Sequence, residues 1–196
     1  MTDKHAVNTA RSSDCLRDHF LLAMPGLSAG IFSHSITYIC EHGESGAMGL
    51  IINQCLDLSL KEIFDHLQIE ASPAFADLPV MAGGPVQMDH GFVLHRHCEH
   101  DWEASLKVTE NITLTTSRDI LRAIAADQGP ADHLIALGYA GWAAGQLEQE
   151  LAENSWLTLP GASDIIFDTP AEQRLGAAAA MLGVDMNLIS GQAGHA

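Results

Sequence analysis

Short apolar runs recur along the chain from His19 onward, and most of them end at Gly, Pro or Asn. Runs of this length that are rich in β-branched and aromatic residues are typical of β-strands. Two of them, residues 47–53 and 133–140, are almost continuously apolar, so we predict that they lie centrally in a sheet with both faces covered. The expected strands are residues 19–24, 35–40, 47–53, 91–95, 105–109, 111–116, 133–140, 155–160 and 164–168.

Helices are predicted where capping residues precede an apolar stripe. Ser59 and Glu62 have the spacing of a capping box, and the residues that follow them have helical periodicity. Three further helices are expected: one capped by Thr116 with Asp119, one capped by Thr169 with Glu172 and ending at Gly183, and one within residues 144–154.

The order of these elements discriminates between fold classes. Residues 35–40 and 47–53 are close in sequence, as are residues 105–109 and 111–116, which favours antiparallel hairpins. Regular alternation of strand and helix is missing, so a doubly wound parallel sheet is not expected. The pattern predicts a mixed sheet with helices packed on it.

The composition agrees with one folded domain. The 196 residues are 47% hydrophobic and 17% charged, unlike a disordered chain. Residues 1–17 are polar and lack the apolar core of a secretory signal, so we expect a flexible tail followed by a single domain at residues 18–196. The four cysteines are widely scattered, which suits a reducing compartment, and no apolar run is long enough to span a membrane. A cytoplasmic location without membrane contact is therefore expected.

The charge restricts the class of partner. The formal net charge is −16, and three of the nine Lys and Arg residues lie in the expected tail. Binding of duplex DNA requires clustered basic side chains that neutralise phosphates. We therefore expect no direct DNA binding, whereas a protein partner or a neutral ligand is compatible with this charge.

One short motif suggests an enzyme. GLSAG matches the nucleophile elbow of α/β-hydrolases, with Ser28 in the position of the nucleophile. The elbow requires a strand that turns sharply into a helix, but residues 31–40 are β-branched and aromatic and are expected to be extended. A Gly-rich turn between two strands is the better interpretation, so no catalytic residue is predicted.

The stretch HRHCEH contains the best candidates for metal ligands, which are His95, His97, Cys98 and His100. Zinc prefers three or four such ligands in a tetrahedral array, and its usual sequence spacings join two separated pairs. One crowded stretch is better interpreted as a polar loop. We therefore predict neither a metal site nor a cofactor, and a metal-dependent function at this stretch is kept as a third hypothesis.

Three turns could form a small-ligand site if the fold brings them together. They are Asn53, the segment MAGGPVQ with Gly83, Gly84 and Gln87, and Ser117 with Arg118 at the start of an expected helix. Backbone N–H groups at such turns can hold anions. However, MAGGPVQ lacks the ending of a P-loop, and Pro85 removes one donor.

Several longer motifs follow one another along most of the chain. They are AMPGL (23–27), YICEHGESGAMGLIIN (38–53), GGPVQMDHGFVLH (83–95), LTTSRDIL (114–121), LGYAGWAAGQLEQEL (137–151), NSWL (154–157) and the closing GHA. In this combination they resemble the YqgE/AlgH family of largely uncharacterised bacterial proteins. The resemblance implies an α+β fold in which a bifurcated, mostly antiparallel sheet wraps into a pseudo-barrel with helices packed outside. It implies a regulatory role in alginate production and transcription, and it carries over no catalytic residue.

The expected function is that of a cytoplasmic, non-enzymatic regulatory or interaction protein that affects transcription indirectly, through protein contacts. The alternative is a small-ligand-binding protein or an enzyme, with its site near the turns at Asn53, Gly83–Gln87 and Ser117. The chain departs from the family pattern after Asn53 and at His90, where members often carry basic residues, and this weakens the case for an anion site shared by the family.

Overall fold

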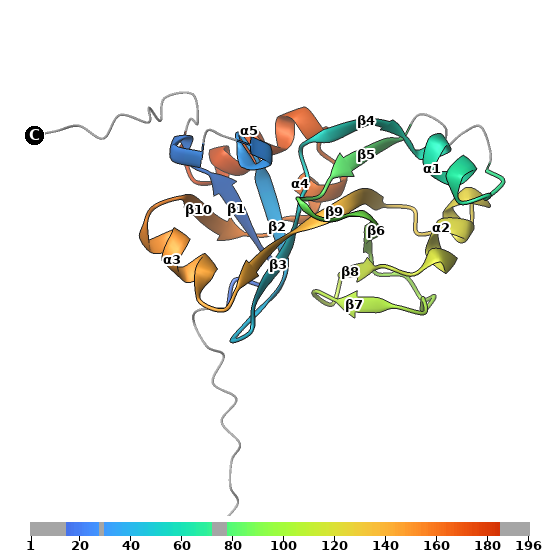
Figure 1. Cartoon of the computed structure of the whole chain (residues 1–196), viewed down its shortest axis with the longest axis horizontal. Helices are drawn as coiled ribbons and strands as arrows, with labels where there is room; N and C mark the ends of the chain where they lie inside the picture. The colour runs from blue at the N-terminus through green and yellow to red at the C-terminus, as the bar shows by residue number, and fades with distance from the viewer. Residues whose placement is uncertain (1–14, 28–29, 72–77, 185–196) are drawn as a thin grey trace, which may run out of the picture.

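The computed structural model describes residues 15–27, 30–71 and 78–184 of the chain. A ten-stranded sheet forms the centre of this part, with α-helices around it (Figure 1). The strands are β1 (His19–Ala23), β2 (Ile36–Gly43), β3 (Gly46–Ile51), β4 (Cys55–Ser59), β5 (Pro79–Ala82), β6 (Val86–Arg96), β7 (Ser105–Lys107), β8 (Ile112–Thr115), β9 (His133–Ala143) and β10 (Trp156–Pro160). The described helices are α1 (Leu60–His66), α2 (Arg118–Ala125), α3 (Gln146–Ala152), α4 (Ser163–Phe167) and α5 (Ala171–Met181), with 3₁₀ turns at Pro25–Leu27 and Gly30–Phe32.

Strand β9 organises the sheet because its two halves pair with different neighbours. Its C-terminal half lies antiparallel to β3, whereas its N-terminal half lies parallel to β5. Strand β6 pairs with β9 in the antiparallel sense. The strand order is β10-β1-β2-β3-β9-β6-β8-β7, with β4 attached to β5, and only the β5–β9 pair is parallel among the described strands. The sheet thus divides along β9 into a first limb, β10-β1-β2-β3, and a second limb, β6-β8-β7.

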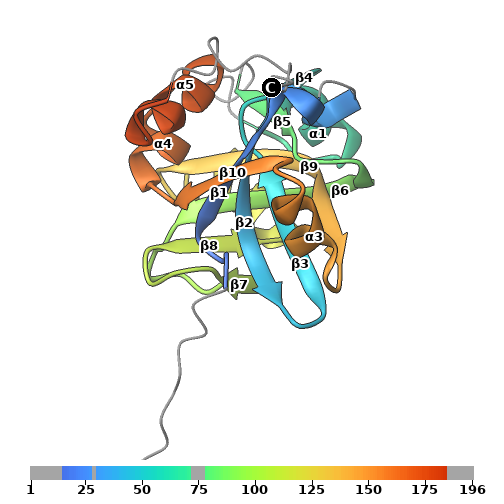
Figure 2. The same cartoon turned by 90° about the vertical axis from the view of Figure 1, so that its left-hand side faces the viewer.

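The two limbs curl toward each other into a half-barrel (Figure 2). Its interior is filled by apolar side chains of both limbs, among them Phe20, Tyr38 and Leu94. Ile166 of α4 and Ala178 of α5 belong to the same core, so these two helices close one end of the half-barrel. The remaining helices cover outer faces: α1 and α2 pack on the second limb, and α3 packs on the first.

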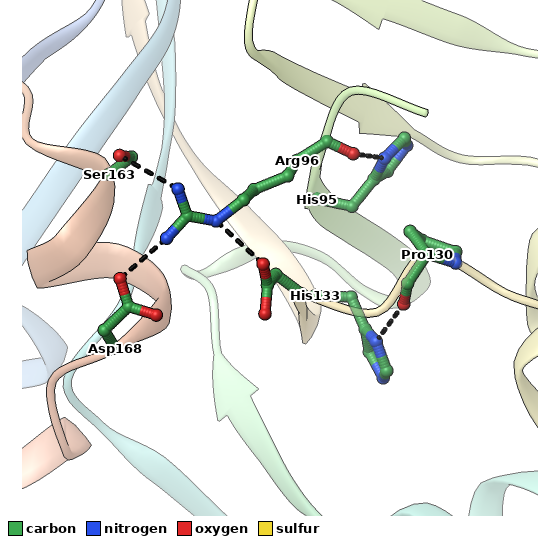
Figure 3. A network of polar contacts seen from close by, with 7 residues as sticks. His95, Arg96, Pro130, His133, Ser163 and Asp168 are labelled. Atoms are coloured by element: carbon green, nitrogen blue, oxygen red, sulfur yellow. Dashed lines mark hydrogen bonds and ion pairs between the residues drawn. The ribbon is translucent and has the colours of Figure 1, made fainter. Parts of the chain in front are cut away.

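Arg96, the last residue of β6, ties the sheet to this closed end. Its guanidinium lies 2.9 Å from the carboxylate of Asp132 and 2.6 Å from that of Asp168, and it donates to the hydroxyl of Ser163 at 3.3 Å (Figure 3). It also lies 5.2 Å from the centre of the Phe167 ring. Because these groups are partly exposed, the packed core should contribute more to closure than the ion pairs do.

The fold class and most elements predicted from the sequence are confirmed. Residues 47–53 and 133–140 supply the central strands β3 and β9, and both expected hairpins, β2–β3 and β7–β8, are antiparallel. Helix α1 begins with the expected capping box. The N–H of Glu62 donates to the Ser59 hydroxyl at 3.3 Å, and the N–H of Ser59 donates to the Glu62 carboxylate at 2.8 Å.

Two segments differ from their predicted conformation. Residues 164–168 were expected to be a strand but form α4, because Ile165 and Ile166 both reach the barrel core from one helical turn. A short apolar run of this kind is compatible with the periodicity of a strand and with that of a helix. The expected extension of residues 31–40 holds only from Ile36 onward, since the chain first makes a 3₁₀ turn at Gly30–Phe32.

Two predicted helix caps are also wrong. Helix α2 begins one residue later than expected, and its Asp119 carboxylate accepts the Ser117 hydroxyl and the N–H of Glu103 instead of completing a box with Thr116. The Thr169 hydroxyl donates to the carbonyl of Asp164 and so joins α4 to α5 rather than capping α5. At α2 the competing partners are the distant residues Glu103 and Ala104, whereas at Thr169 the partner is a carbonyl five residues earlier.

Strands β4 and β5 were not anticipated. Each is short, and β4 runs directly into the capping box of α1, so its pattern merges with the helix signal. The residues just before β1, at the end of the expected tail, contact the sheet: the N–H of Leu16 donates to His42 Nδ1 at 2.9 Å, and Arg17 Nε donates to the Val108 carbonyl at 2.8 Å. Residues 1–14 lie outside the described part. None of the helices described is both long and apolar enough to cross a bilayer.

Candidate functional site

The half-barrel is open at the end away from α4 and α5, and a groove of roughly 790 Å³ lies there between the two limbs. We call it the mouth groove. Its apolar lining comes from both limbs and from β9: Ala47, Met48, Val86, Phe92, Ala104, Leu106, Leu114, Tyr139, Gly141 and Trp142. Its polar lining residues are Glu41, Gln87, Ser105 and Thr116. Mouths of β-barrels that combine apolar walls with a few polar groups are common binding sites.

The aromatic wall of the mouth groove is held by a carboxylate on α3. Glu150 Oε2 accepts the indole N–H of Trp142 and that of Trp156, each at 2.8 Å. The ring of Phe32 packs against both indoles, with ring centres 6.3 and 5.6 Å apart. Both indoles are buried, and their only polar atoms share one acceptor. The orientation of Trp142 at the groove therefore depends on Glu150.

The floor of the groove also contains a fixed aromatic pair. Phe92 and Tyr139 lie on neighbouring strands with ring centres 5.6 Å apart and planes at 62°. Edge-to-face pairs of this geometry are favourable beyond the area that they bury. The walls are therefore preorganised rather than loosely packed.

Among the described strands, β7 forms the free edge of the second limb, and it lines the groove. Two hydrogen bonds that flank β7 show which of its backbone groups face β8. Thr116 N–H donates to Ala104 O, and Val108 N–H donates to Ile112 O. Ala104, Leu106 and Val108 therefore direct their N–H and C=O groups toward β8, whereas those of Ser105 and Lys107 point away from it. The Lys107 carbonyl accepts a hydrogen bond from Arg17. The N–H and C=O of Ser105 are left facing outward along the edge.

A chain of hydrogen bonds runs from Ser105 into the protein. His95 is 1% exposed, and its Nδ1 lies 2.8 Å from the Arg96 carbonyl, which requires the proton on Nδ1. Nε2 must then accept from the Thr115 hydroxyl at 3.0 Å, and Thr115 Oγ1 in turn accepts from Ser105 at 2.8 Å. Burial lowers the pKa of His95, in agreement with a neutral ring. The imidazole contacts the hydroxyl of Thr115 and not that of Ser105. It therefore orients the Ser105 hydroxyl only through Thr115.

The residues predicted for a small-ligand site do not form one cluster. Asn53 donates to the His34 carbonyl and accepts the N–H of Ile36, each at 2.9 Å, so its amide holds the start of β2. The N–H of Gly83 donates to the Leu137 carbonyl at 2.9 Å, and Gly84 packs against the backbone of Tyr139. Gly83 and Gly84 lie where the chain passes over β9 between β5 and β6, so they maintain this crossing.

The other predicted positions lie around two grooves. Gln87 lines the mouth groove. Arg118 lines a second groove of roughly 620 Å³ between α1, α2 and β6, and Thr116 lines both grooves. The hydroxyl of Ser117 is already engaged, because it accepts the N–H of Ala104 at 3.1 Å and donates to Asp119. Binding of a ligand at these residues stays a prediction.

Three of the weak metal candidates, His95, His97 and His100, line one small cavity of roughly 180 Å³. His95 is buried and belongs to the hydrogen-bond network that starts at Ser105, whereas His97 is exposed. The His100 ring packs against Trp102 with ring centres 4.2 Å apart and planes at 49°. The Cys98 thiol donates to the His100 carbonyl at 3.6 Å. Within residues 15–27, 30–71 and 78–184, no three His, Cys, Asp or Glu side chains are grouped closely enough to hold a metal ion. Ser28 lies outside the described residues, and the turn that follows it, at Gly30–Phe32, is too short for the helix of a nucleophile elbow.

Most of the mouth groove was not predicted from the sequence. Phe92, Tyr139 and Trp142 occur in apolar strands, where an aromatic residue is normally interpreted as core. Whether such a ring faces the core or a groove depends on which face of the folded sheet it lies on and on what covers that face. One signal was present, since the GYAGW stretch places two aromatic residues among glycines that cannot cover them.

A forked, mostly antiparallel half-barrel with α-helices outside is an α+β architecture, and solved structures share it. The solution structure of the AlgH protein from Pseudomonas aeruginosa matches with a TM-score of 0.79 and 45% identity, covering 100% of both chains. An X-ray structure of a Corynebacterium diphtheriae protein matches with a TM-score of 0.68 over 90% of this chain and 92% of that one, and at 18% identity it supports the fold alone.

The sequence comparisons identify the family. The family described as AlgH-like matches residues 20–187. A UPF0301 protein of Thioalkalivibrio sulfidiphilus is 57% identical over 94% of this chain and 99% of that protein. Another, from Saccharophagus degradans, is 52% identical over 99% of this chain and 95% of its own length. The chain belongs to the AlgH-like family, as its motifs indicated.

Proposed function

We propose that this AlgH-like protein is a non-enzymatic interaction protein of the cytoplasm and that its mouth groove binds an extended segment of a protein partner. The observation that carries the proposal is the free edge of β7 beside an aromatic groove. Ser105 presents a backbone donor and acceptor that no described residue uses. Leu106, the next residue of β7, lines the groove, and Phe92 of β6 lines it farther from this edge. Strand addition at such an edge gains affinity from backbone hydrogen bonds, while side-chain pockets select the sequence.

The acidic charge of the chain supports a partner segment with basic side chains. The chain has a net charge of −16, and Glu41 lies in the groove lining. A segment with alternating apolar and basic side chains would place its apolar residues against the aromatic wall and its basic residues toward the acidic surface. Complementary charge of this kind increases the association rate and discriminates against acidic segments.

The geometry around Ser105 supports binding rather than catalysis. A nucleophilic serine needs a base within direct hydrogen-bond reach. In this chain Thr115 stands between Ser105 and His95, and the Ser105 hydroxyl serves as the donor of a cross-strand pair. The arrangement rigidifies the edge strand on which a partner would bind.

A role in transcription would then be exerted through the partner protein. The nine Lys and Arg residues against twenty-five Asp and Glu make a continuous phosphate-binding surface difficult to assemble. We expect no specific complex with duplex DNA at physiological salt, and a submicromolar specific complex in a titration would contradict the indirect role.

Photo-crosslinking in the native host tests the proposal. A photoreactive amino acid at Ala104, an exposed residue of the groove lining, should capture one defined protein segment after irradiation. The control carries the same group at Met181, which is 56% exposed on α5 at the closed end. Capture of the same segments from both positions, or of none from Ala104, would contradict the proposal. Mass spectrometry of the adducts identifies the segment.

A further inference from the structure

A small cavity of roughly 160 Å³ lies between β5, the start of β9 and helix α5. Its lining residues are Leu78, Pro79, Met81, His133, Leu134, Ile135 and Arg174. Only two of these, Arg174 and His133, carry charged or strongly polar side chains. The volume equals that of roughly five water molecules in the liquid, so it suits a small ion and excludes a nucleotide.

Arg174 brings a positive charge into this cavity, and no described carboxylate is in direct contact with it, although Glu172 lies near enough to favour its charged form. The residue is 8% exposed. Its Nε donates to the Thr169 carbonyl at 2.9 Å, and its Nη1 donates to the Ile52 carbonyl and lies 3.9 Å from the sulfur of Met81. All three acceptors are neutral, and among the described residues no carboxylate lies within 4 Å of the guanidinium.

A buried cation of this kind is unfavourable unless an anion compensates it. Burial correspondingly lowers the pKa of Arg174. Its Nη2 group has no acceptor among the described residues. The guanidinium therefore has hydrogen-bonding capacity left for a ligand oxygen.

His133 supplies the second polar group. Its Nδ1 lies 2.9 Å from the Pro130 carbonyl, which places the proton on Nδ1 and leaves Nε2 as an acceptor (Figure 3). Nε2 is buried and has no hydrogen-bond partner within the part of the chain that the structure describes. Burial also lowers the pKa of His133, which favours the neutral ring. A ligand hydroxyl would satisfy this atom.

We propose that this cavity binds a small protonated oxyanion, of which hydrogen phosphate is the simplest example. An ionised oxygen accepts from Arg174 Nη2, and the P–OH group donates to His133 Nε2. Sulfate has the same shape and charge but no proton to donate at neutral pH, and acetate lacks both the proton and the tetrahedral shape. The site should therefore prefer phosphate to sulfate, which an unspecific cationic patch would not.

The acidic chain requires a matched salt background in the test. With a net charge of −16, any added salt screens repulsion and stabilises the fold somewhat. Unfolding temperatures in phosphate, sulfate and chloride must therefore be compared at equal ionic strength. A larger increase in phosphate than in sulfate, growing with concentration as binding linkage requires, is the expected result.

Matched variants locate the effect. His133→Phe keeps a planar ring but removes Nε2, and we expect phosphate affinity, measured by isothermal titration calorimetry, to fall about tenfold or more. Arg174→Met should abolish binding. Arg122→Met removes an exposed charge from α2, away from this cavity, and should leave binding unchanged. Equal effects of phosphate and sulfate on the wild-type protein, or full binding by the His133→Phe variant, would overturn the proposal.

A measurement on the wild-type protein covers the case in which Arg174→Met does not fold. In ¹⁵N-labelled protein, phosphate should shift the resonances of the His133 ring nitrogens, with Nε2 moving in the direction of a stronger accepted hydrogen bond. Sulfate at equal ionic strength should shift them far less. If neither salt moves the His133 nitrogens, the cavity does not bind the ion.

Discussion

Replacing Gly138 with alanine should prevent folding or lower the free energy of unfolding by more than about 3 kcal/mol. Gly138 has a φ of +70°, which is unfavourable for residues with a Cβ atom. A Cβ there would lie 2.4 Å from the Gly84 carbonyl oxygen and 3.0 Å from that of Val86. Both obstacles are backbone atoms, so no side-chain rotation can relieve the overlap.

The reason for this close approach lies in the fork of the sheet. Val86 pairs with Tyr139, and Gly91 pairs with Leu137. The four residues 87–90 of β6 therefore bulge out of the strand, because only Gly138 lies opposite them. The bulge carries Gln87 to the mouth groove and leaves Met88 exposed. A side chain at position 138 would push the limbs apart at the point where they meet.

Gly176→Ala is the matched control. Gly176 is exposed within α5, and a Cβ at this position would have no atom of the described residues within 4 Å. Alanine should therefore stabilise the protein by about 0.5–1 kcal/mol through its higher helix propensity. Urea unfolding followed by circular dichroism measures both variants. A Gly138→Ala protein as stable as the wild type would contradict the close crossing.

Glu150→Ala should lower the free energy of unfolding by about 2–4 kcal/mol, because it leaves two buried indole N–H groups without their acceptor. Glu150 Oε2 accepts from Trp142 and Trp156 at 2.8 Å each, and Gln146 donates to its other oxygen at 3.0 Å. Glu150→Gln keeps one oxygen acceptor in place and should lose less than half as much stability.

Glu153→Ala provides the comparison for this effect. Glu153 is exposed, and its carboxylate accepts only from the side chain of Gln149 among the described contacts, so its loss should change stability by no more than about 0.5 kcal/mol. Urea unfolding followed by tryptophan fluorescence reports on two of the three Trp residues directly at the affected site. Equal stability of the Glu150→Ala and Glu153→Ala variants would show that the shared acceptor is unimportant.

The parts of the fold that the sequence predicted are those governed by local physics. Strands β3 and β9 are continuous apolar runs, and the capping box of Ser59 and Glu62 needs only three residues of spacing. Segment 164–168 was misjudged because its orientation is decided by the barrel core, which no short window contains. The cap at Thr116 failed because Asp119 contacts the backbone of Glu103, and the cap at Thr169 failed because its hydroxyl donates to the Asp164 carbonyl.

The candidate site was much harder to anticipate than the fold. The mouth groove combines residues from Glu41 to Trp142, and no motif spans that distance. Gln87 is the one predicted ligand residue that lines it, whereas Asn53, Gly83 and Gly84 maintain the fold. Whether the N–H and C=O of Ser105 face outward depends on the hydrogen-bond register of the β7–β8 hairpin. A shift of one residue would have turned this backbone group inward.

The claim that a partner strand adds to β7 is tested most directly by two substitutions at one residue. Ser105→Pro and Ser105→Ala both remove the hydroxyl that bonds to Thr115, but only proline also removes the outward backbone N–H. Proline is tolerated at an edge where that N–H faces solvent. Binding of the segment captured at Ala104, measured as a synthetic peptide by calorimetry, should weaken about tenfold or more in Ser105→Pro and stay within about threefold of wild type in Ser105→Ala. Equal affinity of the two variants, both folded by circular dichroism, would contradict strand addition in the mouth groove.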